Sequence, residues 1–293
     1  MYSSRRGAGG PSKRKNPYRK EKTSSADLYK TILHKSLDPY KWQAPTPSGD
    51  LPTKQVAMVG HSFPRHHKNA LMRQVPGYDV GPNGGPTFKD IKHLQAAKTL
   101  ASKMGVSAHY HAIYTHCRGI NMVQQLIDQV DSILLLYPDV ILATIGTNNF
   151  ARMPVPPTDA QISDIANQTR VFATLIPPHI PVIFMGMVPR QLSIQMGNAP
   201  HMTDQQFRDV GIKFNAYLKE YEISARQGNV PTNYRYYRMS NWYFSDTQHT
   251  VPIPASAWCG PDGIHPTPAY LLDKYTKSVK NALLEGKNRP PRN

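Results

Sequence analysis

Cysteine is almost absent from this 293-residue chain, which contains only Cys117 and Cys259. This scarcity excludes a small secreted domain held together by disulfides and makes free thiols in a reducing compartment the expectation. The chain also lacks a long apolar run, because the longest one, residues 133–145, is interrupted by Pro138 and Asp139. We therefore expect no transmembrane span. No apolar segment follows the basic amino terminus, so we also expect no signal peptide and an intracellular protein.

Acidic residues are few, with 19 Asp and Glu against 35 Lys and Arg, and the formal net charge is +16. A charge of this size favours an acidic partner, and nucleic acid before a membrane surface, since no basic amphipathic helix is evident. Residues 1–50 are rich in Gly, Pro, Ser, Lys and Arg, which predicts a disordered basic arm. Residues 51–286 are expected to form one domain, and residues 287–293 a basic, proline-rich tail.

The arm concentrates its charge near its start, where residues 1–22 contain eight basic residues and a single acid, Glu21. Such a segment can hold a polyanion by releasing counterions, without reading sequence. A solvated tail or a localisation signal is the alternative interpretation. The residues expected to contact nucleic acid or another polyanion are Arg5, Arg6, Lys13, Arg14, Lys15, Arg19 and Lys20.

Short apolar segments alternate with segments of helical periodicity through the domain. Strands are expected at residues 55–60, 109–114, 139–146, 181–187 and 234–239, the last being more polar and suited to a sheet edge. Helices are expected at residues 88–104, 122–137, 158–176, 203–226 and 268–284, with Asn121 capping the second. This alternation predicts a five-stranded parallel sheet with helices on both faces.

The candidate catalytic groups follow strands or precede the last helix. Ser62 follows the first strand and could act as a nucleophile. Asp262 and His265 lie about one turn apart, so the carboxylate can fix the imidazole tautomer that accepts the serine proton. Gly119 and Asn148 follow the second and third strands and could donate to an oxyanion. Each feature alone also fits a surface turn, but the carboxyl ends of parallel strands share one edge, where one cleft could collect all of them.

Four blocks of the chain occur in the order of those in the SGNH (GDSL-type) hydrolases, which the chain resembles over about residues 55–285: Gly60-His61-Ser62, Arg118-Gly119, Gly146-Thr147-Asn148-Asn149 and Asp262-Gly263-Ile264-His265-Pro266. The resemblance implies a three-layer α/β/α sandwich of the flavodoxin-like type. It also implies an esterase in which Ser62 is the nucleophile, His265 the base and Asp262 its orienter. The oxyanion hole would comprise the Ser62 and Gly119 N–H groups and the Asn148 amide, with neither cofactor nor metal.

Two positions depart from the family pattern, since His61 and Asn149 stand where aspartate is usual. Neither position reacts in the family, so we expect a working esterase. The alternative is a catalytically silent scaffold in a nucleic-acid-associated or assembly protein of a virus or mobile element. His61, Arg65 and Asn149 are expected to contact the substrate. The basic run Arg65-His66-His67-Lys68 would favour an anionic substrate if it points into the cleft, and a solvated face is the alternative. The Gly-x-Ser-x-Gly elbow is absent, because Pro64 takes its last position, which disfavours the α/β-hydrolase fold.

Three further patterns have ordinary interpretations beside functional ones. His109 and His111 could share one face of a strand, but no acidic or cysteine ligand motif accompanies them, so no metal is predicted. Cys117 and Cys259 are expected near one rim of the cleft, where a disulfide is the alternative to free thiols. The aromatic residues between positions 234 and 244 could stack on bases or pack in the core. We expect them to pack in the core.

Overall fold

The computed structural model describes residues 54–72, 110–114, 122–134, 138–195, 201–239, 242–245 and 252–288. Residue contacts divide the chain into two units, Met1–Thr46 and Pro47–Asn293, and every described residue belongs to the second. The predicted basic arm, the predicted helix at residues 88–104 and the carboxyl-terminal tail from residue 289 lie outside the described residues.

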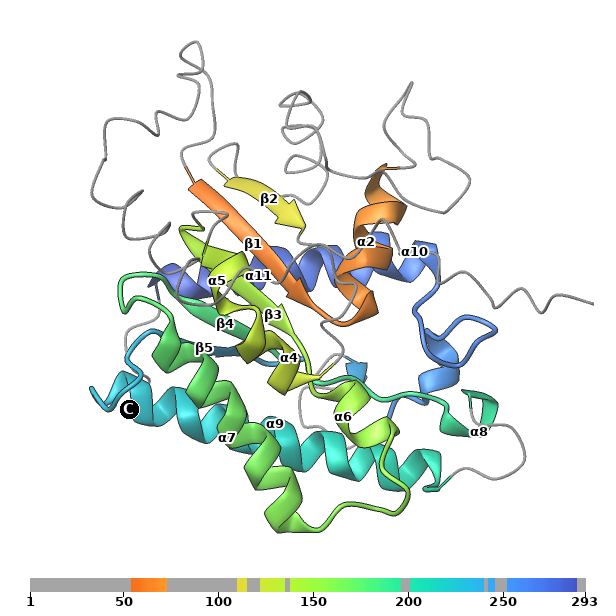
Figure 1. Cartoon of the computed structure of the whole chain (residues 1–293). Helices are drawn as coiled ribbons and strands as arrows, with labels where there is room; N and C mark the ends of the chain where they lie inside the picture. The colour runs from red at the N-terminus through yellow and green to blue at the C-terminus, as the bar shows by residue number, and fades with distance from the viewer. Residues whose placement is uncertain are drawn as a thin grey trace, which may run out of the picture. The chain divides into compact units, whose positions relative to one another are not determined.

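The described elements alternate between strands and helices along the chain (Figure 1). The strands are β1 (Lys54–Gly60), β2 (Tyr110–Tyr114), β3 (Val140–Thr144), β4 (Val182–Met185) and β5 (Tyr234–Tyr237). The helices are α2 (Ser62–Met72), α4 (Val123–Asp128), α5 (Val130–Leu134), α6 (Thr147–Ala151), α7 (Asp159–Leu175), α8 (Leu192–Gln195), α9 (Asp204–Arg226), η3 (Ala255–Ala257), α10 (Pro268–Tyr270), η4 (Leu271–Tyr275) and α11 (Thr276–Asn288).

The strands form one parallel sheet in the order β2-β1-β3-β4-β5. The predicted parallel α/β fold is thereby confirmed, and β5 lies at the edge expected from its polar composition. The chain winds outward from β1 in both directions, so the strand order reverses between β1 and β3. In open α/β sheets, ligands bind at this switch point, beyond the carboxyl ends of the strands. Ser62 follows β1, and Asn148 follows β3.

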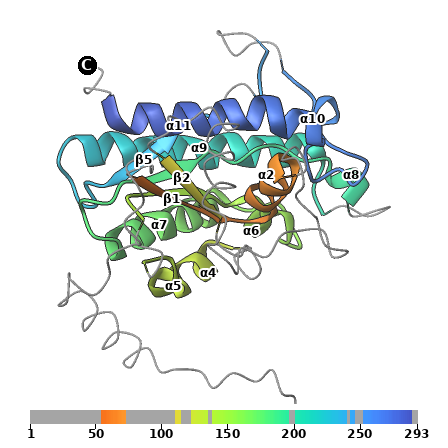
Figure 2. The same ribbon diagram turned by 90° about the horizontal axis from the view of Figure 1, so that it is seen from above.

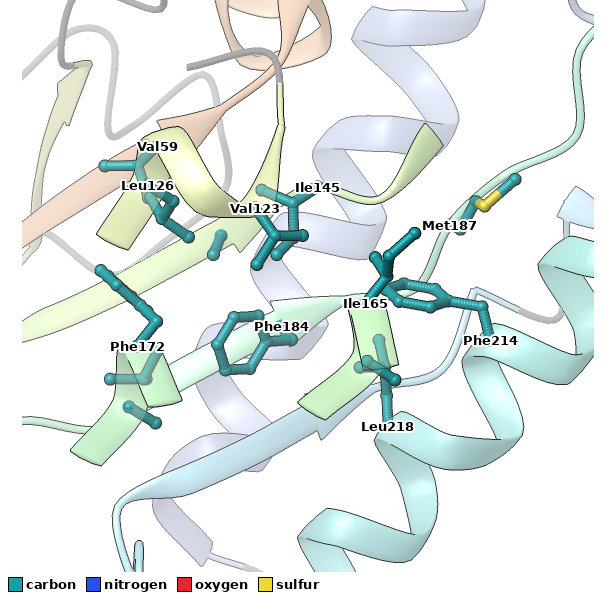
Figure 3. Packing of buried hydrophobic residues seen from close by; sticks show 14 of the residues in the cluster. Val59, Val123, Leu126, Ile145, Ile165, Phe172, Phe184, Met187, Phe214 and Leu218 are labelled. Carbon is teal, nitrogen blue, oxygen red and sulfur yellow. The ribbon is translucent and has the colours of Figure 1, made fainter. Parts of the chain in front are cut away.

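Helices cover both faces of the sheet, as Figure 2 shows from above, with α11 on one side of the strands and α4, α5 and α7 on the other. Successive residues of a strand point to opposite faces, and the buried residues obey this alternation. Ala57, Val59, Ile141 and Ala143 belong to the core shared with α4, α7 and α9, part of which Figure 3 shows. The intervening strand residues pack against α2, η4 and α11.

A threonine caps each of the two long helices, α7 and α9, at the start that the sequence predicts. Thr158 accepts a hydrogen bond from the N–H of Gln161 at the start of α7, and Thr203 accepts one from Gln206 at the start of α9. These side chains satisfy backbone donors that the first helical turn leaves unpaired. The helices predicted at residues 158–176 and 203–226 are therefore confirmed.

The helix predicted at residues 122–137 is wrong in detail, because two short helices, α4 and α5, meet at Gln129. Its predicted cap, Asn121, lies outside the described residues. At the start of α4, the Val123 N–H instead donates to Asn149 Oδ1 over 3.2 Å, a contact across 26 residues of sequence. Local periodicity could not reveal this partner.

Candidate active site

Ser62 is the first residue of α2, directly beyond β1. The turn between these elements depends on Gly60, whose φ of +133° lies in a region that side chains disfavour. A β-carbon on Gly60 would lie 2.0 Å from the carbonyl oxygen of Thr144 on β3, so only glycine fits. The same carbonyl accepts a hydrogen bond of 3.0 Å from the His61 N–H. The serine is thus held at a fixed position beside the carboxyl end of β3.

The structure brings Ser62, His265 and Asp262 into one chain of hydrogen bonds. His265 Nε2 lies 2.6 Å from Ser62 Oγ, although 203 residues separate them in sequence. His265 Nδ1 lies 2.6 Å from Asp262 Oδ2. With the carboxylate accepting from Nδ1–H, Nε2 is left to accept the serine proton, which is the arrangement of a serine, histidine and acid triad.

Asp262 is held as a carboxylate although nearly half of its side chain is exposed. Partial burial raises the pKa of Asp262, but hydrogen bonds from the His265 and Ile264 backbone N–H groups and from the His265 ring outweigh it and bring the pKa to about 2. The two backbone bonds both reach Oδ1 over 2.9 Å. Because Oδ1 is occupied in this way, Oδ2 faces the imidazole.

The turn that carries Asp262 and His265 packs against the loop that follows β4. The Gln191 N–H donates to the Gly263 carbonyl over 2.9 Å. Gly263 has a φ of +67°, and a β-carbon there would lie 2.7 Å from the Gln191 carbonyl oxygen. A second hydrogen bond, from the Gly260 N–H to the His265 carbonyl over 2.7 Å, closes the turn. His265 therefore lies on a turn in which position 263 has no room for a residue larger than glycine.

His66 lies one helical turn after Ser62 on α2 and stacks on the catalytic imidazole. The ring centroids of His66 and His265 are 4.0 Å apart with an interplanar angle of 28°. Its neighbour His67 points elsewhere: it is buried, and its Nε2 lies 2.9 Å from Thr276 Oγ1. Burial lowers the pKa of His67 to about 3, so this imidazole is neutral. Of the two histidines in the basic run after Ser62, His66 therefore contacts the catalytic imidazole and His67 lies in the core.

His61 is buried, with 1% of its surface exposed, and both ring nitrogens are engaged by protein groups. The Phe63 N–H donates to Nδ1 over 3.3 Å, which places the ring proton on Nε2, 3.3 Å from Thr147 Oγ1. Burial, and after it the charge of Arg190, lowers the pKa of His61 well below its usual value. The expectation that His61 contacts substrate does not fit this placement. Instead its neutral ring links the segment of Ser62 to that of Asn148.

Asn148 and Asn149 have different surroundings at the start of α6. Asn148 is half-buried, and no protein group in the described part of the chain shares a hydrogen bond with its side-chain amide. Asn149 instead accepts from the Val123 N–H, so its oxygen positions α4. The expected substrate-binding role of Asn149 stays a prediction. Thr147, which sequence interpretation did not single out, lies in the same block and contacts His61.

Several predicted site residues cannot be placed. Gly119, Cys117 and the seven basic residues of the arm lie outside the described residues, as does the side chain of Arg65. Among the described residues, no group of three or more metal-binding side chains occurs, and Cys259 is a free thiol. Within the same residues, no helix is both long and apolar enough to cross a membrane. Tyr234, Trp242 and Tyr243 are buried in the core, so they are not available for stacking on bases.

No family model and no curated protein matches the chain. Among solved structures, it is similar to a candidate acylhydrolase from Bacteroides fragilis, with 16% identity over 90% of this chain and 97% of that one and a TM-score of 0.46. A GDSL-like lipase from Bacteroides thetaiotaomicron has 13% identity over 89% and 98%, with a TM-score of 0.46. A catalytic mutant of an acetylxylan esterase from Geobacillus stearothermophilus has 13% identity over 80% and 94%, with a TM-score of 0.46.

Proposed function

We propose that the protein is a serine hydrolase that cleaves an acyl ester through an acyl-enzyme. The observation that supports this most strongly is the pair of 2.6 Å contacts that join Ser62 to His265 and His265 to Asp262. A surface turn would explain Asp262 and His265 alone, but it would not bring the second imidazole nitrogen onto a serine at the switch point of the sheet.

In the proposed reaction, Ser62 Oγ attacks the ester carbonyl while His265 Nε2 accepts the serine proton. Asp262 stabilises the resulting imidazolium. The tetrahedral oxyanion accepts hydrogen bonds from the Asn148 amide and the Ser62 N–H, with the Gly119 N–H as the third donor implied by the family resemblance. The imidazolium then protonates the leaving alcohol. Water activated by His265 releases the acyl group and restores Ser62.

A turnover assay with matched serine variants tests this proposal. Ser62→Ala should lower kcat for p-nitrophenyl acetate by about 10⁴-fold or more, because the nucleophile is removed. The matched control is Ser193→Ala, since Ser193 Oγ is also in a side-chain hydrogen bond, donating to the Asp204 carboxylate over 2.9 Å, but has no imidazole partner in the described structure. The control should keep wild-type turnover. Wild-type turnover in a folded Ser62→Ala protein would contradict the proposal.

The charge of the chain supports a second function, binding of nucleic acid or another polyanion by residues 1–22. The supporting observation is the eight basic residues against one acid in that segment. We propose that the arm places the hydrolase on a polyanion. If the triad proves silent, polyanion binding would be the function of a scaffold.

Binding to single-stranded and duplex DNA of equal length, with and without residues 1–22, tests the arm. Full-length affinity should fall steeply between about 50 and 200 mM salt and differ little between sequences. The deletion should reduce both the affinity and its salt dependence. Equal binding by the two proteins at every salt concentration would contradict the second function.

A further inference from the structure

Arg190 is the charged group near the triad that the proposed chemistry does not use. It ends the loop that leaves the carboxyl end of β4, and the next residue, Gln191, donates to Gly263 in the catalytic turn. Only 2% of the Arg190 surface is exposed. The loop before it is fixed, because the Asn215 amide bonds both the N–H and the carbonyl of Met187, over 2.7 and 2.9 Å.

The Arg190 guanidinium acts electrostatically on residues of the catalytic site. Its charge interacts with Asp262 and Cys259 on the catalytic turn and with Arg152 at the end of α6, and it also acts on His61 beside Ser62. These neighbours come from three segments of the chain: the catalytic turn, the end of α6 and the turn before Ser62. Arg190 is therefore a buried cation within electrostatic range of the reacting groups.

Two Arg190 nitrogens, Nε and Nη2, are buried, and no group in the described part of the chain accepts a hydrogen bond from either. The Asp262 carboxylate does not bind them: Oδ1 accepts from the Ile264 and His265 N–H groups, and Oδ2 faces the His265 ring. Cys259 cannot serve as an anion, since burial raises the pKa of its thiol to about 12. Burial lowers the pKa of Arg190 to about 10, which still leaves the guanidinium charged at neutral pH.

A buried charge without a partner is destabilising, and natural proteins rarely retain one without a use. Nε–H and Nη2–H form one edge of the guanidinium, and this edge binds carboxylate or phosphate through two parallel hydrogen bonds. We propose that Arg190 binds an anionic group, carboxylate or phosphate, carried by the ester substrate. The inference rests on the proposed esterase function, whose substrate class it narrows. Because both nitrogens are buried, anion binding requires the side chains that cover them to move.

Paired esters that differ in charge test the substrate class. The probes are p-acetoxybenzoate and p-acetoxyphenyl phosphate, each compared with neutral p-acetoxybenzamide. Arg190→Met should lower the ratio of kcat/KM for anionic over neutral ester by about tenfold to a hundredfold, the range for a lost charge-assisted pair. Arg190→Lys should lose less, because it keeps the charge without the planar edge. The anionic ester whose ratio falls more in Arg190→Met carries the anion that Arg190 binds more strongly.

The control is Arg238→Met, which removes an exposed guanidinium just after β5 and should leave the ratio unchanged. A ratio that stays within twofold in Arg190→Met would overturn the proposal. An equal loss on anionic and neutral esters would overturn it as well, because Arg190 would then act through the triad.

A binding measurement separates failure of this proposal from failure of the esterase function. Succinate or inorganic phosphate should raise the melting temperature of the wild type and of Ser62→Ala, but not that of Arg190→Met. If the wild type hydrolyses no ester yet is stabilised in this Arg190-dependent way, the anion site stands and the esterase function fails. If the anions stabilise wild type and Arg190→Met equally, the proposed site is refuted whether or not esters are cleaved.

Discussion

Replacing Asp262 by asparagine separates the role of its charge from the role of its shape. The backbone N–H groups of Ile264 and His265 both donate to Oδ1 over 2.9 Å. In Asp262→Asn, the amide oxygen must keep that place, because an NH₂ group there would face two donors. The NH₂ group is then forced onto His265 Nδ1, where the wild type has an acceptor at 2.6 Å.

The exchange therefore inverts the tautomer of His265. An amide that donates to Nδ1 makes Nδ1 the acceptor and moves the ring proton to Nε2, the nitrogen 2.6 Å from Ser62 Oγ. A protonated Nε2 cannot accept the serine proton. The corresponding exchange in a serine protease triad lowers kcat by about 10⁴-fold, or about 5.5 kcal/mol of transition-state stabilisation. Since Asp262 is 48% exposed, water can partly replace it, and we expect a loss of about 10³- to 10⁴-fold.

The assay is kcat/KM for p-nitrophenyl acetate near pH 8, with circular dichroism to confirm that the fold is intact. Asp273→Asn is a matched control, because the Asp273 carboxylate lies 2.7 Å from Lys277 in the last helical segment and touches no triad residue. That control should retain activity within about twofold. Activity of Asp262→Asn within tenfold of the wild type would refute the tautomer reasoning, even if Ser62 proved essential.

Three further outcomes follow from the described contacts. Folded His67 stays neutral down to about pH 3, whereas the unfolded chain protonates it below 6.5, so its contribution to stability is lost as pH falls between these values, by about 3 kcal/mol down to pH 4. His67→Gln, which can still donate to Thr276, should flatten that decline in urea unfolding. Gly60→Ala should reduce the free energy of unfolding by more than about 4 kcal/mol, because its β-carbon would meet the Thr144 carbonyl at 2.0 Å. Asn148→Ala should lower kcat by about 10²- to 10³-fold with a normal circular dichroism spectrum, and unchanged kcat would remove it from the oxyanion hole.

The parts of this fold that sequence could predict are those with a local cause. The apolar run before Gly60 and that before Gly146 mark buried strands, and the threonines before α7 and α9 mark helix starts. Asp262 and His265 are three residues apart, so their pairing needed no knowledge of the tertiary structure. The meeting of His265 with Ser62 was expected only from the order of four blocks and from the rule that strand ends share an edge.

The remaining features depend on contacts distant in sequence. Helix α2 was not predicted, because the residues after Ser62 read as a polar, basic run, and only its packing on η4 and β1 buries Phe63 and His67. His61 was expected to face substrate because it is polar, yet Thr147, 86 residues away, gives its ring a buried partner. Arg190 carries no sequence signal at all, since an arginine in a loop is ordinary until its burial is known.

The most direct test of the proposed nucleophile is labelling with a fluorophosphonate probe followed by peptide mapping. An activated serine attacks the probe phosphorus, displaces fluoride and keeps the phosphonyl group, so the wild type should gain one adduct, on the peptide that contains Ser62. His265→Ala should abolish the adduct, and Ser193→Ala should retain it. An unlabelled, folded wild type, or an adduct on another serine, would contradict the account.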